Sequence, residues 1–298
     1  MNSITVAQCL QLAPQLELVS DSTRLDIELI LCHILQKNRT WLFTWPDKNL
    51  TAEQQQLFNE FFARRKNGEP IAHILGQREF WSLPLSVNNS TLIPRPDTEL
   101  LVELVLELFA QDPPQQQRSC LDLGTGTGAI VLAIASEKLA WQLVGVDKSN
   151  DAVALAELNR VQLDFQHVQI KQSDWFANIG AQYFDVIVSN PPYIDPQDPH
   201  LDQGDVRFEP RSALIADNKG LADIEFIIHQ SWDYMLADGW LLLEHGYDQG
   251  AAVRDLLNAR GFVQVQTRRD LGGNERVSFG KKEVAGKKAA AGKKGDAL

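Results

Sequence analysis

Residues 121–130 read Leu-Asp-Leu-Gly-Thr-Gly-Thr-Gly-Ala-Ile, a short apolar run that leads into a glycine-rich turn and a second apolar run. The pattern predicts a buried strand, a tight turn and the start of a helix, because glycine permits sharp turns and close approach of the backbone to a ligand. Gly124-x-Gly126-x-x-Ala129 also satisfies the relaxed dinucleotide-binding fingerprint. The stretch therefore predicts a nucleotide-like ligand but leaves its identity open.

Strand-like and helix-like segments alternate along the chain from Ser119 onward. This alternation predicts an α/β fold with a mostly parallel sheet that is covered by helices on both faces. Ligands of such sheets bind beyond the carboxyl ends of the strands, where the glycine-rich turn also falls. The seven candidate strands are residues 119–123, 142–146, 166–171, 184–189, 239–244, 262–267 and 275–279.

The chain before this region has a helical pattern. Apolar residues between positions 27 and 35 recur at helical spacing after a candidate N-cap, Asp21 or Ser22, and Thr51-x-x-Gln54 is a capping-box pattern. The last residues repeat Ala, Gly and Lys and have the composition of a disordered extension. We therefore expect a helical domain over residues 1–75, a hairpin linker over 76–92, an α/β catalytic domain over 93–280 and a disordered Lys/Ala-rich tail over 281–298.

The composition is that of an ordinary globular protein, with 44% hydrophobic and 22% charged residues in a chain of 298. No apolar stretch approaches the roughly 20 residues that cross a bilayer, and the N-terminus lacks the pattern of a signal peptide. The three cysteines, Cys9, Cys32 and Cys120, are far apart and have no metal-binding spacing. We therefore expect a cytoplasmic protein with reduced thiols, no membrane contact and no metal site.

The charge distribution argues against a nucleic-acid partner. The formal net charge is −11, and the tail from Lys281 carries six Lys against Glu283 and Asp296, so residues 1–280 carry −15. Nucleic-acid binding depends mainly on the neutralisation of phosphates, which an acidic body does poorly. Direct nucleic-acid binding is therefore not expected.

Acidic residues follow the second and third candidate strands. Asp147 ends the second strand and is placed to accept hydrogen bonds from two ribose hydroxyls, a role shared by proteins that bind nicotinamide cofactors and by those that bind S-adenosylmethionine. The third strand ends at Asp174 and Trp175, where the carboxylate can accept from an adenine amine and the indole can pack on the purine. These positions predict an adenosine-containing cofactor.

The fourth candidate strand ends in Asn190-Pro191-Pro192-Tyr193. Proline cannot continue a central ladder, and a residue before proline is held extended, so the strand must stop in a stiff turn. The Asn190 side-chain oxygen and a backbone carbonyl can accept both N–H bonds of a planar NH2 group, and the Tyr193 ring can lie against its face. A hydride-transfer enzyme has no use for this turn. Together with the glycine-rich turn and Asp147, it predicts N-methylation with S-adenosylmethionine.

Eight stretches carry a family resemblance over residues 1 to about 280. The chain resembles the peptide chain release factor glutamine methyltransferases, and only the Lys/Ala-rich tail departs from the family pattern. The matching stretches are residues 78–81 (Arg-Glu-Phe-Trp), 92–99 (Leu-Ile-Pro-Arg-Pro-Asp-Thr-Glu), 122–128, 173–176 (Ser-Asp-Trp-Phe), 189–194, 208–210 (Phe-Glu-Pro), 243–246 (Leu-Glu-His-Gly) and 274–277 (Asn-Glu-Arg-Val).

The resemblance implies a class I S-adenosylmethionine-dependent methyltransferase, with a Rossmann-like seven-stranded sheet and an N-terminal helical domain that docks the substrate. It implies methylation of the side-chain amide of the Gln in the Gly-Gly-Gln motif of release factors, with S-adenosylhomocysteine as second product; we expect a monomer. The implied catalytic residues are Asn190, Pro191 and Tyr193. Substrate binding is implied for Asn190, Pro191, Pro192 and Tyr193, and cofactor binding for Gly124, Thr125, Gly126, Thr127, Gly128, Asp147, Trp175 and Asn190. Asp174 is added to the cofactor-binding residues from its position at a strand end.

This chemistry suits the residues. A carboxamide nitrogen is a poor nucleophile, because its lone pair is delocalised into the carbonyl group. Acceptors that hold both N–H bonds can aim the lone pair at the methyl group and stabilise the positive charge that develops on nitrogen. Neither a metal nor a side-chain base is required, since the product can lose its proton after the transfer.

Three other functions compete with this interpretation. Methylation of a ribosomal-protein glutamine keeps the chemistry, although Arg24-x-Asp26-x-Glu28 and residues 69–73 favour the release-factor branch. A nucleic-acid adenine-N6 methyltransferase would also hold a planar NH2, but the acidic body argues against it. A binding module that senses S-adenosylmethionine would have no need of residues 190–193.

Three further residues have open roles. The stretch from Ile194 to Gly220 has little periodicity, and we expect a loop that grips the substrate, with Glu209 as a candidate contact. Arg95 either orients the substrate or pairs with a nearby acid. His245 follows an apolar strand and is expected to be a hydrogen-bonded structural residue.

Overall fold

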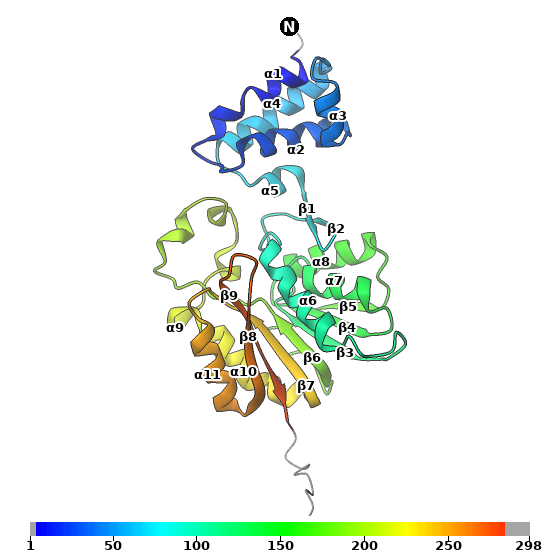
Figure 1. Ribbon diagram of the computed structural model, residues 1–298, viewed down its shortest axis with the longest axis vertical. Helices are drawn as coiled ribbons and strands as arrows, with labels where there is room; N and C mark the ends of the chain where they lie inside the picture. The colour runs from blue at the N-terminus through cyan, green and yellow to red at the C-terminus, as the bar shows by residue number, and fades with distance from the viewer. Residues whose placement is uncertain (1–3, 284–298) are drawn as a thin grey trace, which may run out of the picture.

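The computed structural model describes residues 4–283, which form two parts (Figure 1). A helical part lies at the top of the view, and an α/β part built around one large sheet lies below it. The chain passes between them through an antiparallel hairpin of β1 (Gln77–Phe80) and β2 (Leu83–Ser86). The predicted tail begins too early, because Lys281 and Lys282 belong to the last strand. Residues 284–298 of that prediction lie outside the described residues.

The helical part packs around its own apolar core, which includes the fully buried Phe58, Ile27 and Ile30. The predicted capping box is confirmed: Gln54 N–H donates to Thr51 Oγ1, and the Gln54 side chain accepts from Thr51 N–H. The elements are α1 (Val6–Leu10), η1 (Ala13–Leu16), α2 (Thr23–Leu35), α3 (Arg39–Thr44), α4 (Ala52–Lys66) and α5 (Ile71–Leu75).

The sheet has seven strands in the order β5-β4-β3-β6-β7-β9-β8. Neighbours from β5 to β7 run parallel, while β9 runs antiparallel to both β7 and β8, so the prediction of a mostly parallel seven-stranded sheet is confirmed. The strands are β3 (Ser119–Leu123), β4 (Gln142–Asp147), β5 (Val168–Gln172), β6 (Phe184–Ser189), β7 (Met235–Glu244), β8 (Phe262–Arg269) and β9 (Glu275–Lys282).

Helices cover both faces of the sheet, and alternate residues of each central strand enter different cores. On β6, Val186 and Val188 join the core under α6 and α7, whereas Ile187 joins the core under α10 and α11. These central strands are buried on both faces and therefore read as continuous apolar runs. The helices of this part are η2 (Pro96–Thr98), α6 (Glu99–Leu108), α7 (Ala129–Glu137), α8 (Asn150–Gln162), α9 (Asp217–Gly220), α10 (Ala222–Tyr234) and α11 (Gly250–Arg260).

The segment between β6 and α9 contains three short 3-10 helices, η3 (Pro199–Asp202), η4 (Val206–Phe208) and η5 (Arg211–Ala213). It contacts the helical part through Arg65, whose Nη1 lies 3.3 Å from Asp205 Oδ1. The Arg207 guanidinium lies against Gly68, where an added Cβ would have to displace it. The segment therefore joins the two parts of the molecule.

We call the contacts of Arg65 with Asp205 and of Gly68 with Arg207 the joint between the two parts. Arg65 also belongs to a buried ion pair inside the helical part. Arg65 Nε lies 2.6 Å from Asp26 Oδ2, and both residues are buried. The remaining guanidinium N–H bonds reach backbone carbonyls, with Nη2 donating to Val19 O at 3.0 Å and Nη1 to Glu69 O at 2.9 Å. A buried charge of this kind is tolerated because nearly every polar atom has a partner.

Within residues 4–283, no helix is long and apolar enough to cross a membrane.

Candidate active site

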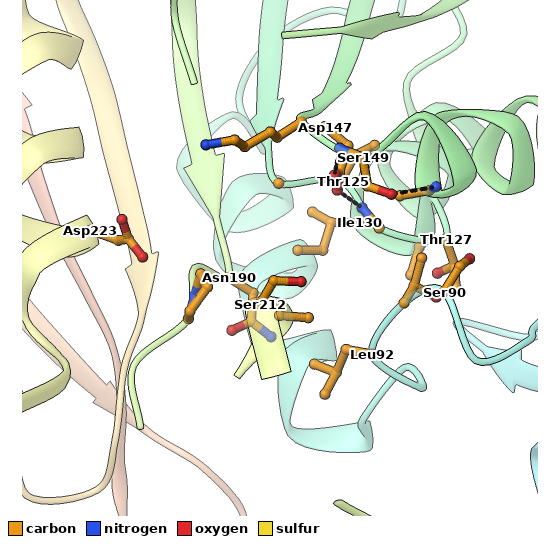
Figure 2. Close-up of a pocket in the computed structure, with 18 of the residues that line it drawn as sticks. Ser90, Leu92, Thr125, Thr127, Ile130, Asp147, Ser149, Asn190, Ser212 and Asp223 are labelled. Carbon is orange, nitrogen blue, oxygen red and sulfur yellow. Dashed lines mark hydrogen bonds between the residues drawn. The ribbon is translucent and has the colours of Figure 1, made fainter. Parts of the chain in front are cut away.

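A pocket of about 480 Å³ lies at the carboxyl ends of β3, β4, β5 and β6 (Figure 2). Its volume is in the range of sites for small molecules and cofactors. Of the predicted site residues, it brings together Gly124, Thr125, Gly126, Thr127, Asp147, Asp174, Trp175, Asn190 and Pro192. Ser90, Thr91, Leu92, Pro94, Arg95, Thr98, Ala129, Ile130, Lys148, Ser149, Ala152, Ser173, Ser212, Ala213, Ile215 and Asp223 complete the lining.

The glycine-rich turn follows β3 directly and opens α7. Gly124 and Gly126 have φ values of +69° and +55°, in the left-handed region that favours glycine. Gly128 does not line the pocket: a Cβ there would meet the Leu132 side chain at 3.0 Å and Ala156 at 3.4 Å. The structure thus places Gly128 at a helix–helix packing point and the other two glycines beside the pocket.

Asp147, at the end of β4, is held by two backbone donors. Gly126 N–H donates to its Oδ2 at 3.0 Å and Ser149 N–H to its Oδ1 at 2.9 Å, as the dashed lines of Figure 2 indicate. Burial raises the pKa of this carboxyl group, while the backbone hydrogen bonds oppose the shift. Each carboxylate oxygen keeps acceptor capacity for a further donor.

Asp174 and Trp175 follow β5 on the same edge of the sheet. Lys148 Nζ lies 2.9 Å from Asp174 Oδ2, and both side chains are largely exposed. Trp175 has a φ of +48°, an uncommon conformation for a bulky residue that is found where surrounding structure enforces it. Its ring lies 3.5 Å from the position that a Cβ of Gly124 would occupy. The indole therefore packs over the glycine-rich turn.

Asn190 lies where β6 ends, and its side chain borders the pocket. Its Nδ2 donates to Thr98 Oγ1 at 3.2 Å. Since Nδ2 is engaged in this way, Oδ1 remains as an acceptor. Thr98 itself is buried at the end of η2, directly before α6. Two segments far apart in the sequence therefore meet at this amide.

Pro191 and Tyr193 do not line the pocket. The Tyr193 ring packs against the core that contains Ile187 and Leu243, and its hydroxyl donates to Glu244 Oε1 at 3.2 Å. Burial raises the pKa of Tyr193 above its usual range, with the nearby Glu244 carboxyl acting in the same direction. The hydrogen bond to Glu244 therefore holds the Tyr193 side chain on the side of the 190–193 turn that faces away from the pocket.

Arg95 and Glu209, whose roles the sequence left undecided, form an ion pair. Arg95 Nη2 lies 2.7 Å from Glu209 Oε2, and Ile93 N–H donates to Glu209 Oε1 at 2.9 Å. Glu209 is buried, and these two contacts fix its loop to the pocket wall. Arg95 lines the pocket.

His245 is a hydrogen-bonded structural residue, as expected. Its Nε2 lies 2.8 Å from Ser278 Oγ and its Nδ1 lies 2.8 Å from Gly246 O. Burial lowers the pKa of its imidazole, which favours the neutral form.

Sequence reasoning missed the pocket residues that come from outside the strand ends. Ser90, Leu92 and Thr98 precede the sheet, whereas Ser212 lies in the loop after β6 and Asp223 in α10. For Ser90, Leu92 and Thr98, the sequence signal that could have found them is the pair of prolines at 94 and 96, because prolines fix the backbone direction of the segment that leads into α6. Within residues 4–283, no group of three or more His, Cys, Asp or Glu side chains has an arrangement that suits a metal ion.

Two protein families match the chain. Residues 10–76 match the family described as PrmC N-terminal domain, and residues 97–206 match the one described as Methyltransferase small domain.

Bacterial relatives match almost the whole chain. The release factor glutamine methyltransferase of Shewanella oneidensis is 52% identical over 277 residues, which cover 93% of this chain and 96% of that protein. The enzyme of the same name from Pseudomonas aeruginosa is 55% identical over 262 residues, covering 88% and 94%. That from Escherichia coli K12 is 52% identical over 262 residues, covering 88% and 93%.

Solved structures share the fold at low identity. A methyltransferase from Pyrococcus furiosus has a TM-score of 0.52 at 16% identity and covers 76% of this chain and 100% of its own. A 16S rRNA methyltransferase from T. thermophilus, in complex with AdoMet and guanosine, has a TM-score of 0.50 at 19% identity, with coverages of 70% and 50%. The predicted class I methyltransferase fold is therefore confirmed.

Proposed function

Because this chain belongs to the family of release factor glutamine methyltransferases, we propose that it methylates the side-chain amide nitrogen of the Gln in the Gly-Gly-Gln motif of release factors, with S-adenosylmethionine as the methyl donor. The observation that carries the proposal is the meeting of Asp147, Trp175 and Asn190 around one pocket. We further propose that the enzyme acts in the cytoplasm as a monomer. Its formal net charge of −11 is consistent with a protein substrate.

The pocket suits an adenosine-containing methyl donor. Gly124 and Gly126 leave room beside the turn, and Asp147 offers two acceptor oxygens for ribose hydroxyls. Trp175 and the Asp174 carboxylate border the same space and can take an adenine ring and its amine. S-Adenosylmethionine would supply an electrophilic methyl group on a sulfonium. The residues present fit this group.

Asn190 can hold the substrate amide beside the cofactor. With Nδ2 bound to Thr98, its Oδ1 can accept one N–H bond of the glutamine amide, and a backbone carbonyl of the turn can accept the other. Both acceptors direct the nitrogen lone pair away from them and stabilise positive charge on nitrogen. The orientation converts a weak nucleophile into one held in line for transfer. The proton that nitrogen loses can pass to water after the transfer.

The direct test is a methyl-transfer assay with labelled S-adenosylmethionine. The acceptors are purified release factor and its variant with Gly-Gly-Ala in place of Gly-Gly-Gln, and the product is mapped by mass spectrometry. We expect label only on the Gln of the unaltered factor. Label on a ribosomal protein or a nucleic acid, with none on the release factor, would overturn the substrate assignment and leave the cofactor assignment standing.

Asp147→Asn is expected to weaken S-adenosylmethionine binding about 10-fold. A hydrogen bond to a charged acceptor contributes about 1.5–3 kcal/mol, and the substitution removes the charge while keeping the shape. The measurement is the dissociation constant from isothermal titration calorimetry. Asp151→Asn serves as the matched control, because Asp151 is exposed on the first turn of α8 and does not line the pocket. Equal affinities of the two variants for S-adenosylmethionine would show that Asp147 does not bind the cofactor.

A further inference from the structure

Arg95, in the segment that leads into α6, is a cation held at the edge of the pocket by a buried carboxylate. Its Nη2 donates to Glu209 Oε2 at 2.7 Å, and the Glu209 side chain is fully buried. Glu209 Oε1 accepts from the Ile93 N–H at 2.9 Å. Both carboxylate oxygens are therefore engaged, and the carboxylate fixes one end of the guanidinium.

The rest of the guanidinium is available to a ligand. Arginine carries several N–H donors in a rigid planar fork. Among residues 4–283, only the hydrogen bond to Glu209 Oε2 uses one of the donors of Arg95. The side chain is 33% exposed, and the residue lines the pocket. Since a guanidinium can hold a carboxylate through two parallel N–H bonds, Arg95 can bind a second anion while it stays paired with Glu209.

Arg95 is one of two basic residues at the pocket. The lining contains three carboxylates, those of Asp147, Asp174 and Asp223, which repel an anionic ligand. Among the described residues of the lining, only Arg95 and Lys148 are basic. Lys148 Nζ lies 2.9 Å from Asp174 Oδ2, and its side chain is 76% exposed. Arg95 is therefore the better anchored of the two basic groups that could receive an anion.

Arg95 lies on the side of the pocket that holds Asn190, away from Asp147. Figure 2 shows Asp147 at the top of the pocket and Leu92 at the bottom, and Arg95 follows Leu92 by three residues. The 3-10 helix η2 begins directly after Arg95 and brings Thr98 Oγ1 within 3.2 Å of Asn190 Nδ2. The reacting sulfur of a methyl donor has to lie near Asn190, because the proposed function holds the substrate amide there.

S-Adenosylmethionine has one anionic group, the carboxylate of its methionine part, which a short aliphatic chain joins to the sulfur. With the ribose at Asp147 and the adenine at Trp175, this chain extends from the sulfur toward the segment that carries Arg95. A carboxylate that leaves water without a partner raises the free energy of the complex, so it requires a cation or several donors. The guanidinium of Arg95 meets both requirements.

The substrate amide is a poorer partner for the same guanidinium. A donor on the amide oxygen strengthens the delocalisation of the nitrogen lone pair and makes the nitrogen a weaker nucleophile. A cation close to the nitrogen also opposes the positive charge that develops there during the transfer. The Gly-Gly-Gln motif, in addition, has no anionic side chain. The chemistry of the reaction therefore favours the cofactor as the ligand of Arg95.

We propose that Arg95 binds the carboxylate of S-adenosylmethionine, and that Glu209 is a positioning residue that holds the guanidinium in the direction required. The inference rests on the cofactor assignment of the proposed function and goes beyond it by assigning the methionine end of the ligand. The pair makes the enzyme selective for a methyl donor that keeps its carboxylate. Because Glu209 belongs to the loop after β6, the same contact ties this loop to a cofactor-binding residue.

The test is isothermal titration calorimetry of the full-length protein with two ligands, S-adenosylmethionine and its decarboxylated form. The second ligand keeps the adenosine, the sulfonium and the amine, and it lacks only the carboxylate. The unaltered protein should prefer S-adenosylmethionine by about 10- to 100-fold, the range for hydrogen bonds between charged groups. Arg95→Met should lower the affinity for S-adenosylmethionine by about the same factor. It should change the affinity for the decarboxylated ligand less than about 3-fold, so that the preference disappears.

Three further variants separate binding from folding. Glu209→Gln should lower the preference by about 3- to 10-fold, because the amide oxygen still accepts from the guanidinium but carries no charge. Arg95→Met combined with Glu209→Gln leaves no unpaired buried carboxylate, and it should lose no more preference than Arg95→Met alone, since Glu209 acts through Arg95. Lys148→Met is the matched control: it removes the other basic group of the lining and should shift both affinities by the same factor.

The outcomes that overturn the proposal are distinct. Equal weakening of both ligands by Arg95→Met would mean that Arg95 only holds the loop in place. Unchanged affinity for both ligands, together with a raised KM for the release factor, would assign Arg95 to the protein substrate instead.

The proposed function fails in a different way, because the titrations contain no acceptor protein. If the unaltered protein shows the preference but does not label the release factor, this inference stands and the substrate assignment is wrong. If it labels the release factor but binds both ligands equally, the function stands and the role of Arg95 is wrong.

Discussion

Asn190→Ala is expected to lower kcat for methyl transfer by about 10²- to 10³-fold. In the proposed complex Oδ1 accepts one N–H bond of the substrate amide, and its loss leaves that N–H unpaired as positive charge develops on nitrogen. Removal of one preorganised contact of this kind costs about 2.7–4 kcal/mol in the transition state. Alanine also abandons the hydrogen bond of 3.2 Å from Nδ2 to Thr98 Oγ1, so the turn loses its anchor on that side.

Single-turnover kinetics with saturating S-adenosylmethionine measure this loss, and calorimetry measures cofactor affinity separately. Affinity should fall much less than the rate, because the amide contributes mainly to the methyl-transfer step. Asn258→Ala on the exposed face of α11 is the matched control and should leave both quantities unchanged. Turnover of Asn190→Ala within about 3-fold of the unaltered enzyme would show that its Oδ1 does not hold the substrate.

Arg65→Met is expected to destabilise the helical part by about 3–5 kcal/mol. The substitution keeps the aliphatic stem but leaves the Asp26 carboxylate buried and without its cation, which lies 2.6 Å away in the structure. Breaking a buried pair by removing one partner costs this much because the remaining charge is uncompensated. The loss would also release Asp205, which the same guanidinium contacts at 3.3 Å.

Hydrogen exchange of the full-length protein measures this effect region by region. Amides of α2 and α4 should exchange on the order of 10²- to 10³-fold faster, whereas those of β3 and β6 should be nearly unchanged. Arg64→Met is the neighbouring control: Arg64 pairs with Glu69 at 2.6 Å in a partly exposed position, where ion pairs contribute less than about 1 kcal/mol. Equal exchange in the two variants would contradict the importance of the buried pair.

Most of the sheet could be predicted from the sequence because its strands are buried on both faces. The apolar run from Phe184 to Ser189 has the same bounds as β6, and residues 119–123 those of β3. The first half of β7 escaped prediction: Leu236, Ala237 and Asp238 are exposed and give no apolar pattern, and the strand starts four residues before the predicted 239. In this first half, the strand forms because it pairs with β6, where the register between the two strands is irregular.

The site was predictable only where the sheet itself gathers the residues. Asp147, Trp175 and Asn190 follow strands whose carboxyl ends share one edge, so their order in the sequence was enough to group them. The position of Thr98 and Asp223 depends on how separate segments fold back over that edge. The direction of the Tyr193 side chain depends on its hydrogen bond to the buried Glu244 of β7, and no pattern in the neighbouring sequence predicts this contact.

The joint between the helical part and the loop after β6 limits how the enzyme can be retargeted by engineering. Arg65 contacts Asp205, Gly68 lies against Arg207, and the same loop continues to Ser212 at the rim of the pocket. A chimera that exchanges residues 1–75 for those of a relative would therefore bring an unmatched surface against this loop. Transplanting residues 199–213 together with the helices would keep the fitted pair intact, so the exchangeable module is discontinuous in the gene.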